Sequence, residues 1–322
     1  MSPQELFDEA VRLEDGGQLE PALRLWRQLV ESHPTRNAFL RLAGITKELG
    51  LLSDAESAFK RALEIVPRSA LALMHLGILA IGRREYETAE AYLKQACGIK
   101  EDPGGFSLLG VALRNNGKPA EAEEAYRNAL RIDPRYEEAY FNLGVLLRHE
   151  RPSEAQASFR AALELDPNFA CAHRELGHLL IRDGANPETE RHLRKAIELD
   201  PRDAWAHIYL GTYLWITADA DGAMAEFREA ARLEPEWSVP LWSLGNIYEN
   251  VLEDFDSARS CFERALELEP GSQEALKNLG RLSKKRGQTD LAKEYLRRAL
   301  LLDPDNQRVQ ALLQDVNGDA SS

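Results

Sequence analysis

Basic side chains at helical spacing are the first residues in this sequence that could bind a ligand. Arg174, His178 and Arg182 follow one another at intervals of four, which places them on one face of a helix. Such a row of cations could hold an acidic segment or a C-terminal carboxylate through charge-assisted hydrogen bonds. The simpler alternative is a solvated helix face. The candidates on basic faces are Arg148, Arg174, His178, Arg182, Lys277, Asn278 and Arg281.

Aromatic side chains form the second group of candidates. Residues 203–216, DAWAHIYLGTYLWI, would form a helix that is apolar around its whole circumference. A helix of this kind is either buried on both sides or binds something. The rings therefore either accept an apolar side chain of a partner or are covered by neighbouring helices. The aromatic candidates are Trp205, Tyr209, Trp215 and Trp242.

Metal binding and catalysis find little support in the residue pattern. Four histidines occur between His149 and His192, but their spacing does not bring several ligands to one point. His173 takes the packing position that Tyr140 holds 33 residues earlier, so we expect it in the core. The sequence has no phosphate-binding loop, nucleophile elbow or paired-cysteine motif. We expect no metal, no cofactor and no enzymatic activity.

The elements that carry these residues repeat along the chain. Prolines recur at a mean interval of about 34 residues, the length of a helix–turn–helix repeat. A glycine lies within the first helix of most units, and in seven of eight cases it is ten residues after the preceding proline. The prolines are Pro34, Pro67, Pro103, Pro134, Pro167, Pro201, Pro235, Pro270 and Pro304; the glycines are Gly44, Gly77, Gly110, Gly144, Gly177, Gly211, Gly245 and Gly280.

The second helix of each unit carries an alanine, a large residue and another alanine on one face. Residues 137–169 show the pattern in full, and the ring of Phe159 is expected to fill the space left open by Gly144. This pattern resembles the tetratricopeptide repeat. The matching residues are Tyr140, Leu143, Gly144, Ala155, Phe159, Ala162 and Pro167.

The resemblance implies an all-α, right-handed superhelical α-solenoid of about nine helix pairs plus a C-terminal capping helix. It also implies that the first helices of the repeats form a concave wall that binds partners. We expect an N-terminal capping repeat, eight further repeats, a capping helix and a disordered tail. Their boundaries are 1–36 for the capping repeat; 37–69, 70–102, 103–136, 137–169, 170–203, 204–237, 238–272 and 273–304 for the repeats; 305–316 for the capping helix; and 317–322 for the tail.

One junction breaks the regular spacing. The interval between prolines becomes 36 before Pro103 and 31 after it, and two glycines follow this proline. The spacing predicts a longer second helix before the junction and a short first helix after it. Residues 98–106 are either a hinge or a static kink.

Composition limits the partners. The formal net charge of −13 disfavours nucleic acid and anionic membranes. No apolar run is long enough to span a bilayer, and the N-terminal residues do not read as a signal peptide. Three cysteines in distant repeats are not expected to pair, which favours a cytoplasmic location.

Together these features predict a non-enzymatic adaptor or scaffold that binds a protein or peptide in its concave groove, with acidic and apolar residues in the ligand. Two alternatives remain open. The chain could self-associate as an assembly factor, or it could recruit substrates for a separate enzyme such as a glycosyltransferase. The oligomeric state does not follow from the sequence.

Overall fold

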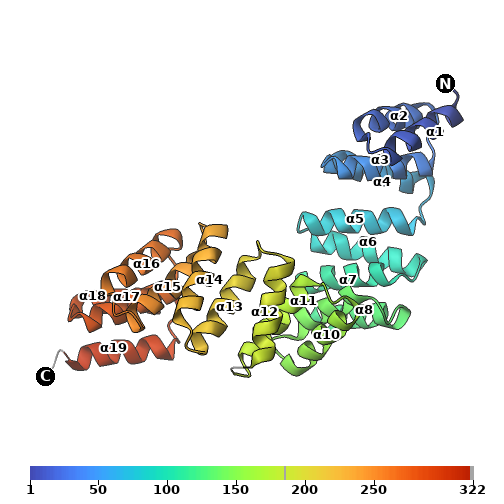
Figure 1. Cartoon of the computed structure of the whole chain (residues 1–322). Helices are drawn as coiled ribbons and strands as arrows, with labels where there is room; N and C mark the ends of the chain where they lie inside the picture. Colours follow the sequence, from blue (N-terminus) through green and yellow to red (C-terminus); the bar gives the residue numbers. More distant parts are fainter. Residues whose placement is uncertain (185, 320–322) are drawn as a thin grey trace. The chain divides into compact units, whose positions relative to one another are not determined.

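The computed structural model describes residues 1–184 and 186–319, and every regular element in these residues is a helix. The predicted all-α class, with nine helix pairs and a final helix, is confirmed (Figure 1). The helices are α1 (Pro3–Asp15), α2 (Leu19–Ser32), α3 (Arg36–Glu48), α4 (Leu52–Ile65), α5 (Ala70–Gly82), α6 (Tyr86–Ile99), α7 (Pro103–Asn115), α8 (Pro119–Ile132), α9 (Glu137–Leu147), α10 (Pro152–Leu165), α11 (Ala170–Ile181), α12 (Pro187–Leu199), α13 (Ala204–Ile216), α14 (Ala220–Leu233), α15 (Ser238–Asn250), α16 (Phe255–Leu268), α17 (Gln273–Lys285), α18 (Thr289–Leu302) and α19 (Gln307–Asp319).

The helices form two compact units, residues 1–167 and 168–322. Within each unit, consecutive helices pack as antiparallel pairs and each pair stacks on the next, as expected for an α-solenoid (Figure 1). First helices of successive repeats also touch, as in α7 with α9 and α11 with α13. None of the helices in the described ranges is long and apolar enough to cross a bilayer.

The contact between glycine and a large side chain joins the two helices of a repeat. A Cβ atom added to Gly144 would lie 2.6 Å from Cε1 of Phe159, and one added to Gly211 would lie 2.6 Å from Cε1 of Phe227. Any larger residue would push these two helices apart, because both rings are buried. The assignment of Gly44 to this role is wrong, because a Cβ atom added to it would have no neighbour within 4 Å. In that repeat the preceding residue, Ala43, is the small residue that is fully buried in the same cluster as Phe59.

The junction at residues 98–106 differs from the prediction. Helix α6 has 14 residues and α7 has 13, the lengths found in most other repeats, so neither helix is longer or shorter than usual. Pro103 is the first residue of α7, whereas the corresponding prolines of the other repeats lie between two helices. The Asp102 carboxylate caps α7 by accepting a hydrogen bond from the Gly105 N–H at 2.9 Å. Proline is tolerated in a first helical turn because its missing N–H would have no partner there. A hinge at this junction stays a prediction.

The C-terminal helix covers the apolar end of the second unit. Val309 and Val316 of α19 are buried against α17 and α18 in a cluster that includes Leu296. The helix continues to Asp319, so the first three residues of the expected tail are helical. The other three, 320–322, lie outside the described residues.

A buried carboxylate links two repeats of the first unit. Glu90 of α6 accepts hydrogen bonds from Lys94 Nζ at 2.7 Å, from Lys118 Nζ at 2.9 Å and from Asn116 Nδ2 at 2.8 Å. The bond from Lys94, opposed by burial and aided by the bonds from Lys118 and Asn116, lowers the pKa of Glu90 to about 2. The ionised form of Glu90 therefore favours the folded state.

We expect this carboxylate to make the first unit sensitive to acid. Because the folded-state pKa is depressed, the stabilisation is complete above the ordinary value of 4.5 and is lost as the pH falls toward about 2. Glu90→Gln should flatten the fall in unfolding free energy over this range, measured by urea titration followed by circular dichroism. Glu87→Gln, which changes an exposed acid on the same helix, is the control. Equal pH slopes for wild type and Glu90→Gln would contradict the assignment.

Candidate functional site

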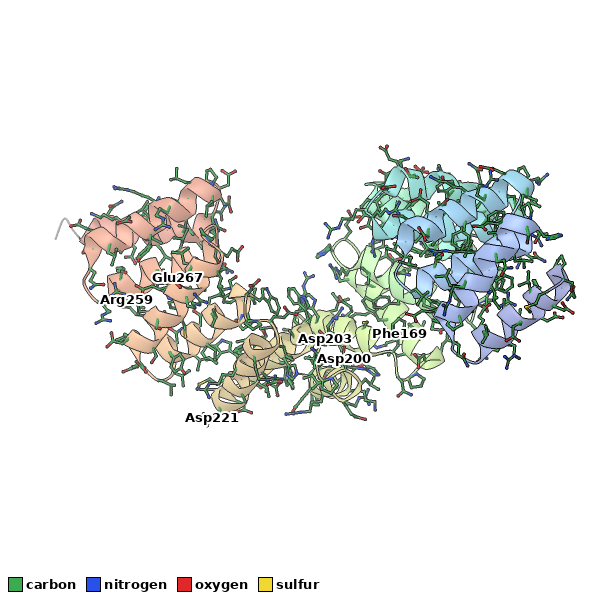
Figure 2. All side chains as sticks on the ribbon, turned by 90° about the horizontal axis from the view of Figure 1, so that it is seen from above. Phe169, Asp200, Asp203, Asp221, Arg259 and Glu267 are labelled. Carbon is green, nitrogen blue, oxygen red and sulfur yellow. The ribbon has the colours of Figure 1, made fainter. Side chains whose placement is uncertain are left out.

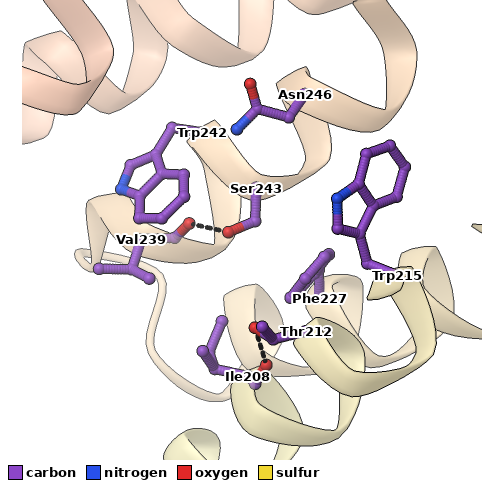
Figure 3. A pocket seen from close by; sticks show the side chains of 8 residues that line it. All are labelled: Ile208, Thr212, Trp215, Phe227, Val239, Trp242, Ser243 and Asn246. Carbon is purple, nitrogen blue, oxygen red and sulfur yellow. Dashed lines mark hydrogen bonds between the residues drawn. The ribbon is translucent and has the colours of Figure 1, made fainter. Parts of the chain in front are cut away.

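A pocket opens between the first helices of two neighbouring repeats in the second unit. Helix α13 packs on α11 and α15 packs on α17, and the pocket lies between α13 and α15. Its volume is about 170 Å³. Figure 3 shows the side chains that line it, which are Ile208, Thr212, Trp215, Phe227, Val239, Trp242, Ser243 and Asn246.

The walls of the pocket are mostly apolar. Trp215, at the end of α13, and Trp242, on α15, stand on either side of it (Figure 3). The buried ring of Phe227, which also contacts Gly211, lies between them at the base. The contact that holds the repeat together therefore also shapes the pocket.

Three of the side chains that line the pocket are polar. The hydroxyl of Thr212 donates to the Ile208 carbonyl at 2.8 Å, and that of Ser243 donates to the Val239 carbonyl at 2.9 Å (Figure 3). Both hydroxyl protons are thus used within their own helices, while the oxygens can still accept a hydrogen bond. Oδ1 of Asn246 accepts from the Arg281 guanidinium at 2.8 Å, which leaves Nδ2 as a donor.

The basic residues predicted in the ninth repeat are paired within the chain. Arg281 bonds both carboxylate oxygens of Glu249, at 3.1 and 2.8 Å, and Lys285 lies 2.9 Å from the same group. Glu249 is 1% exposed, so this carboxylate is buried between α15 and α17. Lys277 forms an ion pair with Glu274. These cations offer less to an acidic ligand than their spacing suggested.

Asn278 requires a correction. It was expected on the accessible wall beside the basic residues, but it is 1% exposed. Asn278 is one of the buried residues of α17, on the face of the helix that packs inside the repeat. A side chain with this burial cannot contact a partner while the repeat is folded.

The predicted basic face of the sixth repeat is also largely compensated. Arg174 pairs with Asp203 at 2.7 Å and with Glu175 at 2.9 Å. Burial opposes the charge on Arg174, but these two carboxylates together raise its pKa. His178 stacks on the ring of Tyr209, with centroids 4.1 Å apart.

The other two basic candidates are Arg182 and Arg148. Arg182 is exposed at the C-terminal end of α11. Arg148 belongs to the first unit, where its Nε donates to Nε2 of His149 at 3.1 Å. The structure therefore does not describe Arg148 as part of one site with Arg174.

The four aromatic candidates fall into two groups. Trp215 and Trp242 line the pocket. Trp205 and Tyr209 lie in the N-terminal half of α13, where their ring centroids are 5.6 Å apart. Trp205 is 47% exposed, and its ring meets the edge of Trp237 with centroids 4.4 Å apart. Trp237 was not among the candidates from the sequence, although Tyr136 and Phe169 hold the same place just before the first helix in earlier repeats.

Two of the four histidines between His149 and His192 contact each other. His173 is buried, as predicted, and its Nδ1 lies 2.7 Å from Nδ1 of His192. Burial, followed by the charge of His173, lowers the pKa of His192 to about 4. Among the described residues no group of three or more histidine, cysteine, aspartate or glutamate side chains could hold a metal ion.

Stacked helix pairs with an apolar pocket between first helices define a helical-repeat protein. Three tetratricopeptide repeat family models match the chain, one over residues 47–106 and 145–188, one over 110–148 and one over 252–316. The chain belongs to the tetratricopeptide repeat family, as its sequence pattern indicated.

Solved structures support the fold. The chain resembles the structure described as the APC/C hetero-tetramer Cut9-Hcn1, with a TM-score of 0.65 and 16% identity, over 98% of this chain and 67% of that one. It also resembles PilF of Pseudomonas aeruginosa, with a TM-score of 0.57 and 21% identity, over 66% of this chain and 97% of that one. At these identities the similarity concerns the fold.

Curated relatives match over shorter stretches. The probable biofilm formation methyltransferase WspC of Pseudomonas aeruginosa is 32% identical over 103 residues, which are 31% of this chain and 24% of the relative. The protein O-mannosyl-transferase Tmtc3 of Drosophila melanogaster is 28% identical over 127 residues, 38% of this chain and 14% of the relative. The chain thus spans less than a quarter of the length of these relatives.

Proposed function

We propose that this chain is a non-enzymatic protein-interaction scaffold that binds an apolar side chain of a partner segment in the pocket between α13 and α15. The pocket itself carries the proposal. It opens between the first helices of two repeats, and two tryptophan rings flank it. Buried aromatic side chains around a pocket are typical of the residues that dominate binding energy at protein interfaces.

The size of the pocket suits one side chain. An apolar cavity of about 150 Å³ in another protein binds a benzene molecule. A pocket of about 170 Å³ can therefore take a ring or a branched aliphatic group of similar size. Leucine and phenylalanine are the side chains that match it.

The polar groups at the pocket suit the backbone of an extended segment. The hydroxyl oxygens of Thr212 and Ser243 can accept from backbone N–H groups, and Nδ2 of Asn246 can donate to a carbonyl. Pairing of this kind avoids leaving polar groups desolvated and unpaired when a segment covers the pocket. The proposed ligand is thus a peptide segment with one leucine or phenylalanine, and not a small apolar molecule.

Peptide selection can test this proposal without a known partner. A random peptide library would be selected on the wild type, with the Trp215→Ala/Trp242→Ala variant as the counter-target. We expect peptides that contain leucine or phenylalanine and that bind the variant at least about 30-fold more weakly, since each such residue is worth about 1–2 kcal/mol or more.

The matched control variant is Trp26→Phe, which alters a buried tryptophan of the first unit. It should bind the selected peptides like the wild type. Peptides that bind the wild type and the Trp215→Ala/Trp242→Ala variant equally well would contradict the site, provided that circular dichroism shows equal helicity.

A second candidate function is that of a substrate-recruiting arm for a separate transferase. It is favoured by the relatives whose names include methyltransferase and mannosyl-transferase, each of which contains a segment similar to between 31% and 38% of this chain. Purification of the chain from its native cell should then yield a transferase in constant ratio. A chain that recovers only copies of itself would favour self-association, which light scattering at several concentrations would measure.

We also propose a cytoplasmic location, which the three free cysteines support.

A further inference from the structure

A second hollow lies at another edge of the second unit. It is bounded by the turn between α12 and α13 and by the turn between α14 and α15, and its volume is about 580 Å³. Trp205 and Trp237 both line it and meet edge to face. Figure 2 shows Asp200 and Asp203 together in the first of the two turns. We call this hollow the aromatic corner.

The aromatic corner has an uncompensated negative charge. Its lining includes four carboxylates and two guanidinium groups, which leaves a net charge of −2; they are Asp200, Asp203, Glu234, Glu236, Arg174 and Arg202. The Arg174 guanidinium is already bound to Asp203. In the described parts of the chain, neither Glu234 nor Glu236 forms an ion pair, and both are exposed.

The rings in the corner are available to a ligand. Trp205 exposes 47% of its surface although it lies on a helix whose other large residues are mostly buried. The N–H of Trp205 donates to Asp203, which caps α13, so the backbone that carries this ring is held in place. Both rings line the hollow that the carboxylates surround, and they meet edge to face with centroids 4.4 Å apart. Ring faces with carboxylates beside them attract a cation.

We propose that the aromatic corner binds a cationic side chain, arginine or lysine, of the partner segment. The ring faces of Trp205 and Trp237 contact the cation and its apolar stem, and Glu234 and Glu236 supply the opposite charge. This inference rests on the proposed function and specifies the partner: it is basic and apolar rather than acidic and apolar. Trp205 and Ile208 are three positions apart on α13, so the corner and the pocket lie on adjacent turns of one helix.

Three short fluorescein-labelled peptides test the charge preference. They share one leucine and one length, and their charged positions hold arginine, glutamine or glutamate. By fluorescence anisotropy at low salt, the arginine peptide should bind the full chain roughly tenfold more tightly than the glutamine peptide. Added salt should reduce this difference.

Two variants assign the preference to the corner. Trp205→Leu/Trp237→Leu keeps apolar side chains but removes the ring faces, and Glu234→Gln/Glu236→Gln removes the charge. Each should bring the affinity of the arginine peptide down to within about threefold of that of the glutamine peptide. The control Asp221→Asn/Asp290→Asn removes two exposed acids from the first turns of α14 and α18, and Figure 2 shows Asp221 well apart from Asp200 and Asp203.

A chemical readout checks the place of binding. Cys171 lines the corner, so the arginine peptide should slow its alkylation by iodoacetamide, followed residue by residue with mass spectrometry. Cys261 does not line the corner and should react at an unchanged rate. Equal binding of the three peptides, or an arginine preference that survives both corner variants, would overturn this inference. Loss of glutamine-peptide binding in the Trp215→Ala/Trp242→Ala variant would still support the pocket, so the two proposals fail separately.

Discussion

Replacing Arg281 and Lys285 together by leucine should lower the unfolding free energy of the second unit by about 3–5 kcal/mol. Both cations pair with Glu249, whose side chain is fully buried between α15 and α17. Without them the carboxylate would remain in the interior with no opposite charge. Most of the lost free energy is the cost of keeping this anion away from water. Arg281 and Lys285 are partly exposed, so their own removal contributes less. Urea unfolding followed by circular dichroism measures the change.

Two further variants separate this explanation from a general effect of lost cations. The triple variant that adds Glu249→Leu removes the buried charge and should recover most of the stability. Arg232→Leu/Arg264→Leu removes two exposed cations whose partner carboxylates are not buried, and should change the unfolding free energy by less than about 1 kcal/mol. If the triple variant were less stable than the double variant, the buried charge would not be the cause.

Phe227→Ala should reduce both stability and peptide binding. The ring is 4% exposed and contacts Gly211, so its removal leaves a cavity that costs about 3–5 kcal/mol. The same ring lines the pocket between α13 and α15, so its loss should also weaken the selected leucine or phenylalanine peptides by roughly tenfold or more. Denaturant titration and fluorescence anisotropy measure the two effects.

The repeat architecture provides a matched control. Phe159 contacts Gly144 in the first unit as Phe227 contacts Gly211 in the second. Phe159→Ala should therefore lose a similar free energy of unfolding, since its ring is 0% exposed, but it should leave peptide affinity unchanged. Equal loss of peptide binding in both variants would show that Phe227 acts through global stability and not through the pocket.

Much of the fold is predictable from the sequence because the repeat is local. Turn prolines, a small residue in the first helix and an alanine–aromatic–alanine face in the second lie within one unit of about 34 residues. The errors arise where two local signals compete. The repeat spacing predicts that Pro103 follows a helix, but it starts α7. The glycine pattern predicts a packing role for Gly44, but the buried small residue of that repeat is Ala43.

The site is less predictable. The apolar pattern identifies Trp215 and Trp242 as candidates, and they do line a pocket. The same pattern cannot separate them from Trp205, because all three rings lie on first helices at similar spacing. Thr212, Ser243 and Asn246 carry no signal of their own in the sequence, since each is an ordinary polar residue on a helix.

The sequence by itself determined the family, the all-α class and the number of helix pairs, because these depend on residue types at fixed intervals along the chain. The tertiary structure decided which charges remain free. Arg281 and Glu249 are 32 residues apart, and Arg174 and Asp203, the N-cap of α13, are 29 apart. Each pair therefore links the first helices of two successive helix pairs and forms only when these helices stack. At the aromatic corner Arg174 is compensated in this way and Glu234 and Glu236 are not, which leaves the lining with a net charge of −2.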